Sequence, residues 1–241
     1  MKHHILHGAG LALRPALLAS LKNKSPDNLQ FLELTPPDWV GMGGKTGQDL
    51  AELTQRFPSV CLSQSLSLGG PGILDKEVLR DLRSFIEEHD IQVFSEALAW
   101  SADDAPLFIN LPIPSTKAAV KWTVSRIAQV QDALGLAIGI RNVAHHMHTP
   151  WVEMNEAEFI SAVVKASGCR LHLDLHALAA NGLRFNFDPH AFLQALPLSR
   201  VDYVRVGQEF GLLDDVLART HRRIARCVDD VKQLNLEAMT C

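Results

Sequence analysis

Three polar side chains alternate with leucines in the segment Leu171–His176. A β-strand directs successive side chains to opposite faces, so His172, Asp174 and His176 are predicted to share one face. Imidazole and carboxylate groups on one face of a strand could hold a metal ion. The alternative is a buried polar patch that is satisfied by its neighbours.

The geometry of an extended strand limits this metal site. One carboxylate and two histidines suffice for mononuclear iron, so Asp174, His176 and Glu237, with His172, could form a reduced site. However, His172 and His176 would be about 13 Å apart along a strand, too far to bind one ion directly. The histidine-rich run 145–148 could supply another ligand, although histidines in loops are commonly exposed and incidental.

The elements that would position these residues alternate along the whole chain. Short apolar segments alternate with helical ones such as Asp214–Val231, and a proline-containing loop follows the fourth apolar segment. This alternation is typical of an α/β protein with a (β/α)8 TIM barrel. The expected strands are Ile5–Leu13, Leu29–Thr35, Val60–Leu66, Ile91–Glu96, Leu136–Asn142, Arg170–His176, Val201–Val206 and Leu234–Glu237. No linker, low-complexity segment or sequence repeat divides the chain, so we expect one domain over residues 1–241. Because the eighth strand is expected so close to the C-terminus, we expect the barrel to be slightly truncated there.

Functional groups of such barrels sit at the carboxyl ends of the strands. The polar residues that the sequence places there are Glu33, Gln64, Glu96, Arg141, Asp174, His176, Arg205 and Glu237.

Composition narrows the class of protein. The 241 residues are 47% hydrophobic and 21% charged, which is ordinary for a globular domain. A net charge of -4 argues against a nucleic-acid partner, and the absence of a long apolar run argues against a membrane span or signal peptide. The cysteines at 61, 169, 227 and 241 are scattered, which is typical of reduced thiols in a cytoplasmic protein.

Several short motifs, in their order and spacing, carry a family resemblance. They are Gly8–Pro15, Leu32–Trp39 followed by Gly43-Gly44, Ser65–Gly69, Ser95–Ser101, Gln129–Asp132 and Phe187–Pro189. Together they resemble the multinuclear non-haem iron-dependent oxidases, the family of methanobactin biosynthesis protein B, also known as domain of unknown function family 692. The resemblance implies a TIM barrel with iron at its mouth, oxidative modification of cysteines or other residues in ribosomally made precursor peptides, and a partner protein.

The resemblance also implies particular metal ligands, and several of these positions carry other residues. The family histidine before the Ser-Leu-Ser-Leu-Gly run falls on Leu62, and the histidine of the Ser-Glu-His-Leu-Ala-Trp motif falls on Ala97. The glutamate that ends the fifth strand falls on Arg141. The histidine that ends the seventh strand falls on Arg205.

Other positions of the family motifs carry the residue that the resemblance implies, or a different polar residue. Asp174 keeps the aspartate of the sixth strand, Asn142 keeps the asparagine of the Glu-Asn-Pro motif, and His176 replaces an asparagine. Glu237 matches the glutamate of the eighth strand. The Asp-x-His pair expected after the seventh strand is missing from Gly207–Leu213.

Arginine is a poor replacement for a metal ligand. A guanidinium stays protonated and has no lone pair to donate. Two unit charges 4 Å apart interact by about 4 kcal/mol at an effective dielectric of 20, and a divalent ion doubles that repulsion. Arg141 and Arg205 could instead pair with Asp174 and Glu237 and so replace the charge of the metal. Alternatively they could be solvated strand-end charges, or grip a carboxylate or phosphate.

Three functions remain open. The first is a metal-free pseudoenzyme with no expected cofactor, which binds a precursor peptide or pairs with an active oxidase of the family. The second is an iron-dependent oxidoreductase with a reduced site at Asp174, His176 and Glu237. The third is a small-anion binding barrel that uses Arg141 and Arg205. The predicted barrel-mouth residues are Glu33, Arg141, Asn142, Asp174, His176, Arg205 and Glu237.

Overall fold

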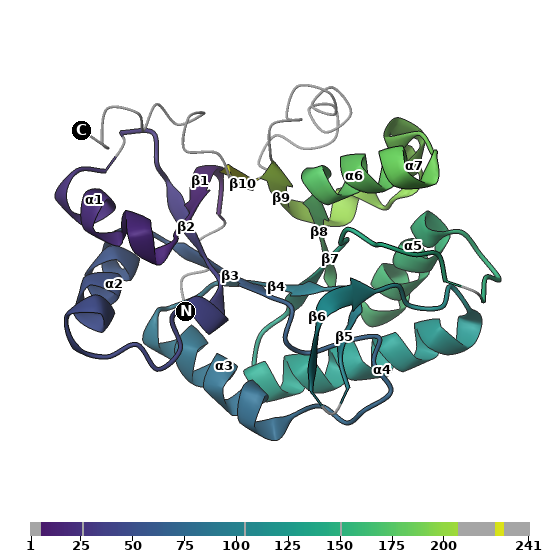
Figure 1. The fold of residues 1–241 in the computed structure, drawn as a ribbon, viewed down its shortest axis with the longest axis horizontal. Helices are drawn as coiled ribbons and strands as arrows, with labels where there is room; N and C mark the ends of the chain where they lie inside the picture. The colour runs from purple at the N-terminus through teal and green to yellow at the C-terminus, as the bar shows by residue number, and fades with distance from the viewer. Residues whose placement is uncertain (1–5, 26, 104, 150, 207–224, 229–241) are drawn as a thin grey trace.

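The computed structural model describes residues 6–25, 27–103, 105–149, 151–206 and the backbone of 225–228. Eight parallel strands close into a barrel in the order β1-β10-β9-β8-β7-β4-β3-β2 (Figure 1). The predicted TIM-barrel fold is therefore confirmed. The strands are β1 (Gly8–Ala12), β2 (Phe31–Leu34), β3 (Ser59–Ser63), β4 (Val93–Ala97), β7 (Ile138–Arg141), β8 (Arg170–Asp174), β9 (Val201–Val206) and β10 (Ala225–Val228).

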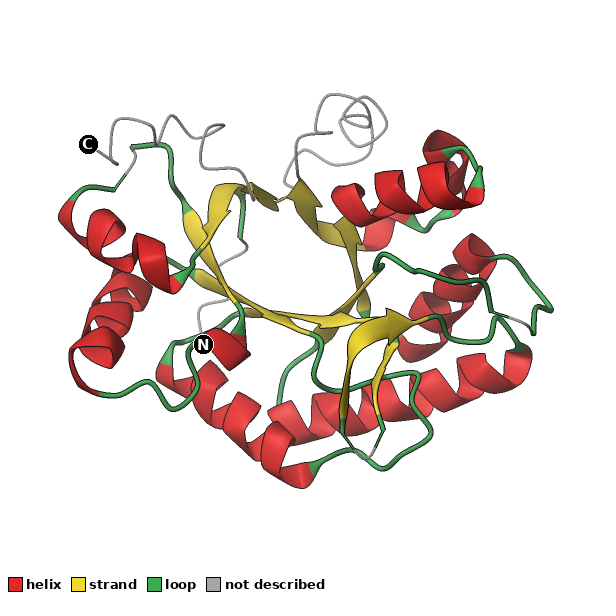
Figure 2. Cartoon of the chain, in the orientation of Figure 1, coloured by secondary structure: helices red, strands yellow, loops and turns green. Residues whose placement is uncertain are grey.

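Helices cover the outside of the barrel (Figure 2). Left-handed glycines end two of them, Gly135 after α4 and Gly168 after α5, because glycine adopts a positive φ without strain. The helices are α1 (Leu18–Asn23), α2 (Gly44–Arg56), α3 (Lys76–Glu88), α4 (Lys117–Leu134), α5 (Glu156–Ser167), α6 (Leu175–Phe185) and α7 (Pro189–Ala195), with short 3-10 turns η1 (Pro15–Leu17), η2 (Pro36–Asp38) and η3 (Leu198–Arg200). No helix in the described ranges is both long and apolar enough to cross a lipid bilayer.

The strands separate two apolar layers. Leu32 and Leu34 belong to a large cluster shared with the helices, whereas Phe31 packs with Val60 and Tyr203 in a smaller cluster. These three side chains come from β2, β3 and β9, and residues of β2 and β9 can meet only across the lumen. Alternation along β2 therefore places Glu33 in the lumen with Phe31.

A hairpin lies outside the barrel, in the segment predicted as a proline-containing loop (Figure 1). Its strands are β5 (Trp100–Ala102) and β6 (Pro106–Leu111), which pair antiparallel. The Ser67 hydroxyl accepts from the backbone N–H groups of Ser101 and Ala102 and donates to the Ala102 carbonyl. These bonds fix the hairpin to the loop that follows β3.

Two strand predictions are wrong in position. The eighth strand is Ala225–Val228, inside the segment predicted as a helix, and not Leu234–Glu237. This strand contains an arginine and a cysteine and lacks a clear apolar alternation, so its sequence signal is weak. Residues 229–241, including Glu237, lie outside the described part of the structure, so the slight truncation at the C-terminus stays a prediction. The sixth strand ends at Asp174 and not at His176.

Candidate functional site

Two arginines and two carboxylates form a connected network at the carboxyl ends of the barrel strands. The Oδ2 atom of Asp174 lies 3.4 Å from Nη1 of Arg205 and 3.6 Å from Nη1 of Arg141. Arg205 also donates from Nε to Oε1 of Glu33 at 3.2 Å, and the Tyr203 hydroxyl donates to the other oxygen of Glu33. The two guanidinium charges therefore face two buried carboxylates.

Asp174 has two structural roles at the end of β8. Its Oδ1 atom accepts a hydrogen bond from the backbone N–H of Ala177 at 2.9 Å and so caps helix α6. The strand consequently stops at Asp174, and His176 lies exposed in the first turn of α6. The prediction that His176 shares a strand face with Asp174 is therefore wrong.

Two asparagines hold the segment after β7 in place. The Asn142 side chain accepts from the backbone N–H of Asp174 at 2.8 Å and donates to its carbonyl at 2.9 Å. The Asn181 side chain accepts from the backbone N–H of His145 and donates to the Val143 carbonyl, both at 2.9 Å. Asn142 thus positions the backbone of the network without adding a charge to it.

A second polar group lies deeper in the lumen. The His172 ring packs against Tyr203 at 5.3 Å between centroids, with Nε2 3.0 Å from Oδ1 of Asp202. Gly139 leaves room for this ring, because a Cβ there would lie 2.0 Å from it. Burial alone would raise the pKa of Asp202, but the adjacent His172 and Arg170 hold this pKa below its usual value.

Glu96 lies on the other face of its strand, against the large apolar cluster. Alternation puts it on the side of Phe94, while Ala97 packs with Ala99 and Val143. Its Oε1 accepts from the backbone N–H of Leu66 at 3.1 Å, and its Oε2 is buried with no hydrogen-bond partner in the described structure. Burial raises the pKa of this carboxyl to about 7.

Comparison with known proteins decides the family. The profile described as RiPP precursor modification enzyme MbnB/TglH/ChrH matches residues 8–240. The chain belongs to this family. A UPF0276 protein of Nitrosospira multiformis is 35% identical over 212 residues, covering 88% of this chain and 75% of the relative. A UPF0276 protein of Pseudomonas aeruginosa is 38% identical over 206 residues, covering 86% and 72%.

Solved structures agree on the fold alone, because their sequence identity is low. A D-psicose 3-epimerase in the presence of D-fructose has a TM-score of 0.61 at 14% identity, over 92% of this chain and 84% of that one. Endonuclease IV from Thermus thermophilus has a TM-score of 0.55 at 13% identity, over 92% of each chain. Both therefore support the barrel and carry no argument about chemistry.

The four positions at which the resemblance implies a ligand and this chain carries another residue lie together in this member of the MbnB/TglH/ChrH family. Ala97 pairs with Arg141 between β4 and β7, and Asp174 pairs with Arg205 between β8 and β9. Leu62 follows the lumen residue Val60 by two positions on β3, so it faces the same side. The resemblance therefore assigns ligands to positions that the fold brings to one region.

The residues at this region do not fit an iron centre. Both carboxylates are engaged by guanidinium groups, which cannot coordinate a metal. Within the described residues, no group of three or more His, Cys, Asp or Glu side chains is arranged to hold a metal ion. Glu237 lies outside those residues, so the reduced site with Asp174 and His176 stays a prediction.

Sequence reasoning missed two partners in the lumen. Tyr203 alternates with Arg205 along Val201–Val206, and this spacing could have identified it as a lumen residue. Asp202 pairs with His172 because the register between β8 and β9 shifts there, and no sequence signal predicts that shift. Gln64 follows β3 and lines a neighbouring cavity, away from the charged network.

Proposed function

We propose that this protein is an iron-free, non-catalytic member of its family, which binds a precursor peptide or pairs with an active oxidase. The observation that carries the proposal is the contact of Arg141 and Arg205 with one carboxylate, Asp174. The family resemblance implies a glutamate at the position of Arg141 and a histidine at the position of Arg205. The arginines supply the positive charge that a buried carboxylate needs.

Electrostatics disfavours a metal ion at this network. A divalent cation near Asp174 would stand beside two fixed guanidinium charges, and each pairwise repulsion at about 4 Å amounts to several kcal/mol at an effective dielectric of 20. The ion could not recover this energy from the arginines, because they offer no lone pair. Metal binding here would require both ion pairs to break.

Charge balance also disfavours a small-anion clamp. Two formal positive charges, on Arg141 and Arg205, face two formal negative charges, on Glu33 and Asp174. A phosphate or carboxylate would have to displace internal carboxylates that are already held by the fold. We therefore interpret the arginines as internal ion-pair partners.

A cavity beside the mouth supports a peptide-binding role. It has a volume of about 520 Å³ and lies between the segment after β3 and the β5–β6 hairpin. Gln64, Ser65 and Asn110 contribute polar groups to its wall, and Ile73 and Ile109 contribute apolar ones. Mixed walls of this kind suit an extended peptide, which presents backbone amides and side chains together.

The state of the described cysteines is consistent with a cytoplasmic location of the protein. Cys61 and Cys169 are buried free thiols, and burial raises the pKa of both. Unpaired thiols are typical of a reducing compartment.

Peptide chemistry tests the proposal directly. The protein is incubated with Fe(II), dioxygen and the precursor peptide of an active relative, and peptide binding and peptide mass are both measured. We expect binding, or a change in the rate of the active relative, with no change of peptide mass by this protein alone. A modification that depends on this chain would overturn the proposal.

A further inference from the structure

A second cavity lies beside the barrel, enclosed by the segments that follow β4, β6, β7 and α6. Its volume is about 250 Å³, which is small for a whole ligand and suits one large side chain. Its apolar wall consists of Leu98, Pro112, Ile113, Met147, Val152, Met154, Phe159, Ile160, Phe185 and Phe187. None of the charged residues of the barrel-mouth network lines it.

Backbone contacts hold two of the segments around the cavity in place. The linker before α4 and the loop before α5 meet in a parallel bridge between Ser115 and Val152. The Ser115 carbonyl accepts from the N–H groups of Glu153 at 2.9 Å and Met154 at 3.2 Å. These bonds fix two sides of the cavity, so a ligand would meet a largely preformed site.

The polar part of the wall consists of Ser115, His145, His148, Thr149, Asn155 and Glu156, and among these Glu156 is the carboxylate. His145 Nε2 lies 3.3 Å from Oε1 of Glu156, whose side chain is 34% exposed. The lining contains no lysine or arginine. The carboxylate of Glu156 therefore gives the cavity a preference for a ligand that carries a positive charge near an apolar group.

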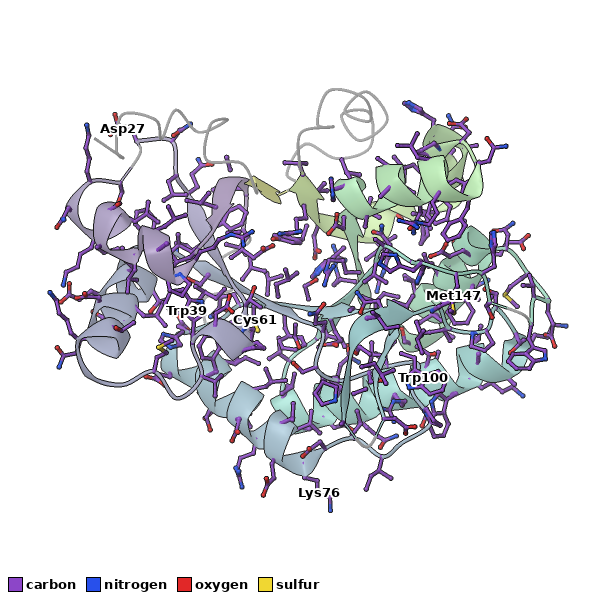
Figure 3. The ribbon with its side chains drawn as sticks, in the orientation of Figure 1. Asp27, Trp39, Cys61, Lys76, Trp100 and Met147 are labelled. Atoms are coloured by element: carbon purple, nitrogen blue, oxygen red, sulfur yellow. The ribbon has the colours of Figure 1, made fainter. Side chains whose placement is uncertain are left out.

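Apolar surface continues outward from the cavity. Met147 and Val152 line it and are 53% and 62% exposed, and the neighbouring Trp151 is 68% exposed. Figure 3 labels Met147 on the segment between β7 and α5. Clustered exposed apolar side chains around a cavity indicate an interaction site.

We propose that this cavity anchors one aromatic side chain of a bound peptide, with a basic residue next to it. The inference rests on the proposed peptide-binding function and names the peptide's chemistry. The ring fills the apolar cavity, and the adjacent cation lies over Glu156. A cavity of this volume excludes a folded domain, and the Glu156 carboxylate disfavours an acidic segment next to the ring.

Three capped dipeptides test the two parts of the proposal. N-acetyl-Phe-Arg-amide is compared with N-acetyl-Ala-Arg-amide and N-acetyl-Phe-Glu-amide in NMR titrations of the full chain. We expect the alanine peptide to bind at least about tenfold more weakly, because the ring is no longer buried. We expect the glutamate peptide to bind about fivefold more weakly, as is typical of a partly exposed charge pair. Equal affinities for the Phe-Arg and Ala-Arg peptides would overturn the proposal.

Exposed positions supply the variants. Val152→Lys places a cation at the rim and should abolish Phe-Arg binding, whereas Val40→Lys, at a 42% exposed valine that does not line this cavity, should leave it unchanged. Glu156→Gln should remove the preference for arginine over glutamate and keep the preference for phenylalanine over alanine. Unchanged binding by Val152→Lys would contradict the assignment.

Failure of this inference can be told apart from failure of the proposed function. If the precursor peptide binds unmodified but Val152→Lys does not weaken it and the dipeptides do not bind, only the anchor cavity is wrong. If the dipeptides bind as expected but the precursor peptide is oxidised, the non-catalytic function is wrong. A dimer that Val152→Lys dissociates would assign the patch to a second copy of the chain and overturn the peptide proposal.

Discussion

The Asp174 carboxylate and the Arg205 guanidinium lie 3.4 Å apart, on neighbouring positions of β8 and β9. Arg141 approaches the same carboxylate oxygen from β7 on the other side, at 3.6 Å. The aspartate that the family resemblance assigns to a metal is thus flanked by arginine on both adjacent strands. Because these arginines pair with a buried carboxylate, we expect them to contribute to the stability of the barrel.

Arg205→Met should destabilise the protein strongly. The change leaves Glu33 and Asp174 without their shared cation, and breaking a buried ion pair typically costs 3–5 kcal/mol; partial exposure of Arg205 lowers this to about 3 kcal/mol. Urea denaturation monitored by circular dichroism measures the loss. Arg184→Met, an exposed arginine in the last turn of α6, is the matched control. Equal stability of the two variants would show that the network is not a stabilising unit.

Glu96→Gln should alter how stability depends on pH. The folded-state pKa of Glu96 is about 7, above its ordinary value of 4.5, so the unfolded chain releases this proton first. The contribution of Glu96 to the free energy of unfolding of the parent therefore falls by up to about 3 kcal/mol as pH rises from about 4.5 to about 7.

The glutamine variant lacks this component, so its stability relative to the parent should grow across the same pH window. Denaturation at several pH values measures the difference. Glu77→Gln, an exposed residue of α3, should give a pH profile parallel to the parent. If Glu96→Gln also runs parallel, the raised pKa is wrong.

Asn142→Ala should loosen the junction of β7 and β8. It removes two buried hydrogen bonds to the backbone of Asp174, and the unpaired backbone groups should cost about 2–4 kcal/mol. Hydrogen exchange at the Asp174 amide should accelerate in step with this loss. The exposed Asn28→Ala serves as control. Unchanged exchange at Asp174 would mean that Asn142 does not position the site.

Restoring the ligands should restore a response to iron. A variant that combines Leu62→His, Ala97→His, Arg141→Glu and Arg205→His should be less stable than the parent without metal, because its carboxylates lack a cation. Fe(II) at about 100 times its dissociation constant should stabilise the variant by about 2.7 kcal/mol. The parent under the same anaerobic conditions should not respond. A parent that is stabilised as much as the variant would remove the basis of the proposed function.

Period-two alternation predicted much of the barrel mouth. It placed Arg141, Asp174 and Arg205 at the carboxyl ends of their strands, where the structure has them. It failed at His176, because Asp174 is both the last strand residue and the cap of α6, so the pattern changes to a helix there. The Tyr203–Glu33 contact joins residues far apart in the chain, and only closure of the barrel brings them together.

The face of a strand also decides which polar residues belong together. Glu96 and Arg141 both lie near strand ends, yet Glu96 points toward the helices with Phe94. Its strand is buried on both faces, so apolar alternation does not reveal which face is the lumen. The eighth strand could not be placed for a related reason, since Ala225–Val228 carries little apolar signal.

Iron content of the untagged protein tests the central claim most directly. The tag is left out because it could bind nickel or zinc. The histidine-rich run 145–148 could also bind these metals, so iron itself is measured by inductively coupled plasma mass spectrometry after expression in iron-supplemented medium. If arginines occupy the place of the metal, the purified chain should carry far less than one equivalent of iron, and Arg205→Met should not lose any. One or more equivalents of iron per chain, with loss of that iron in Asp174→Ala, would contradict the account.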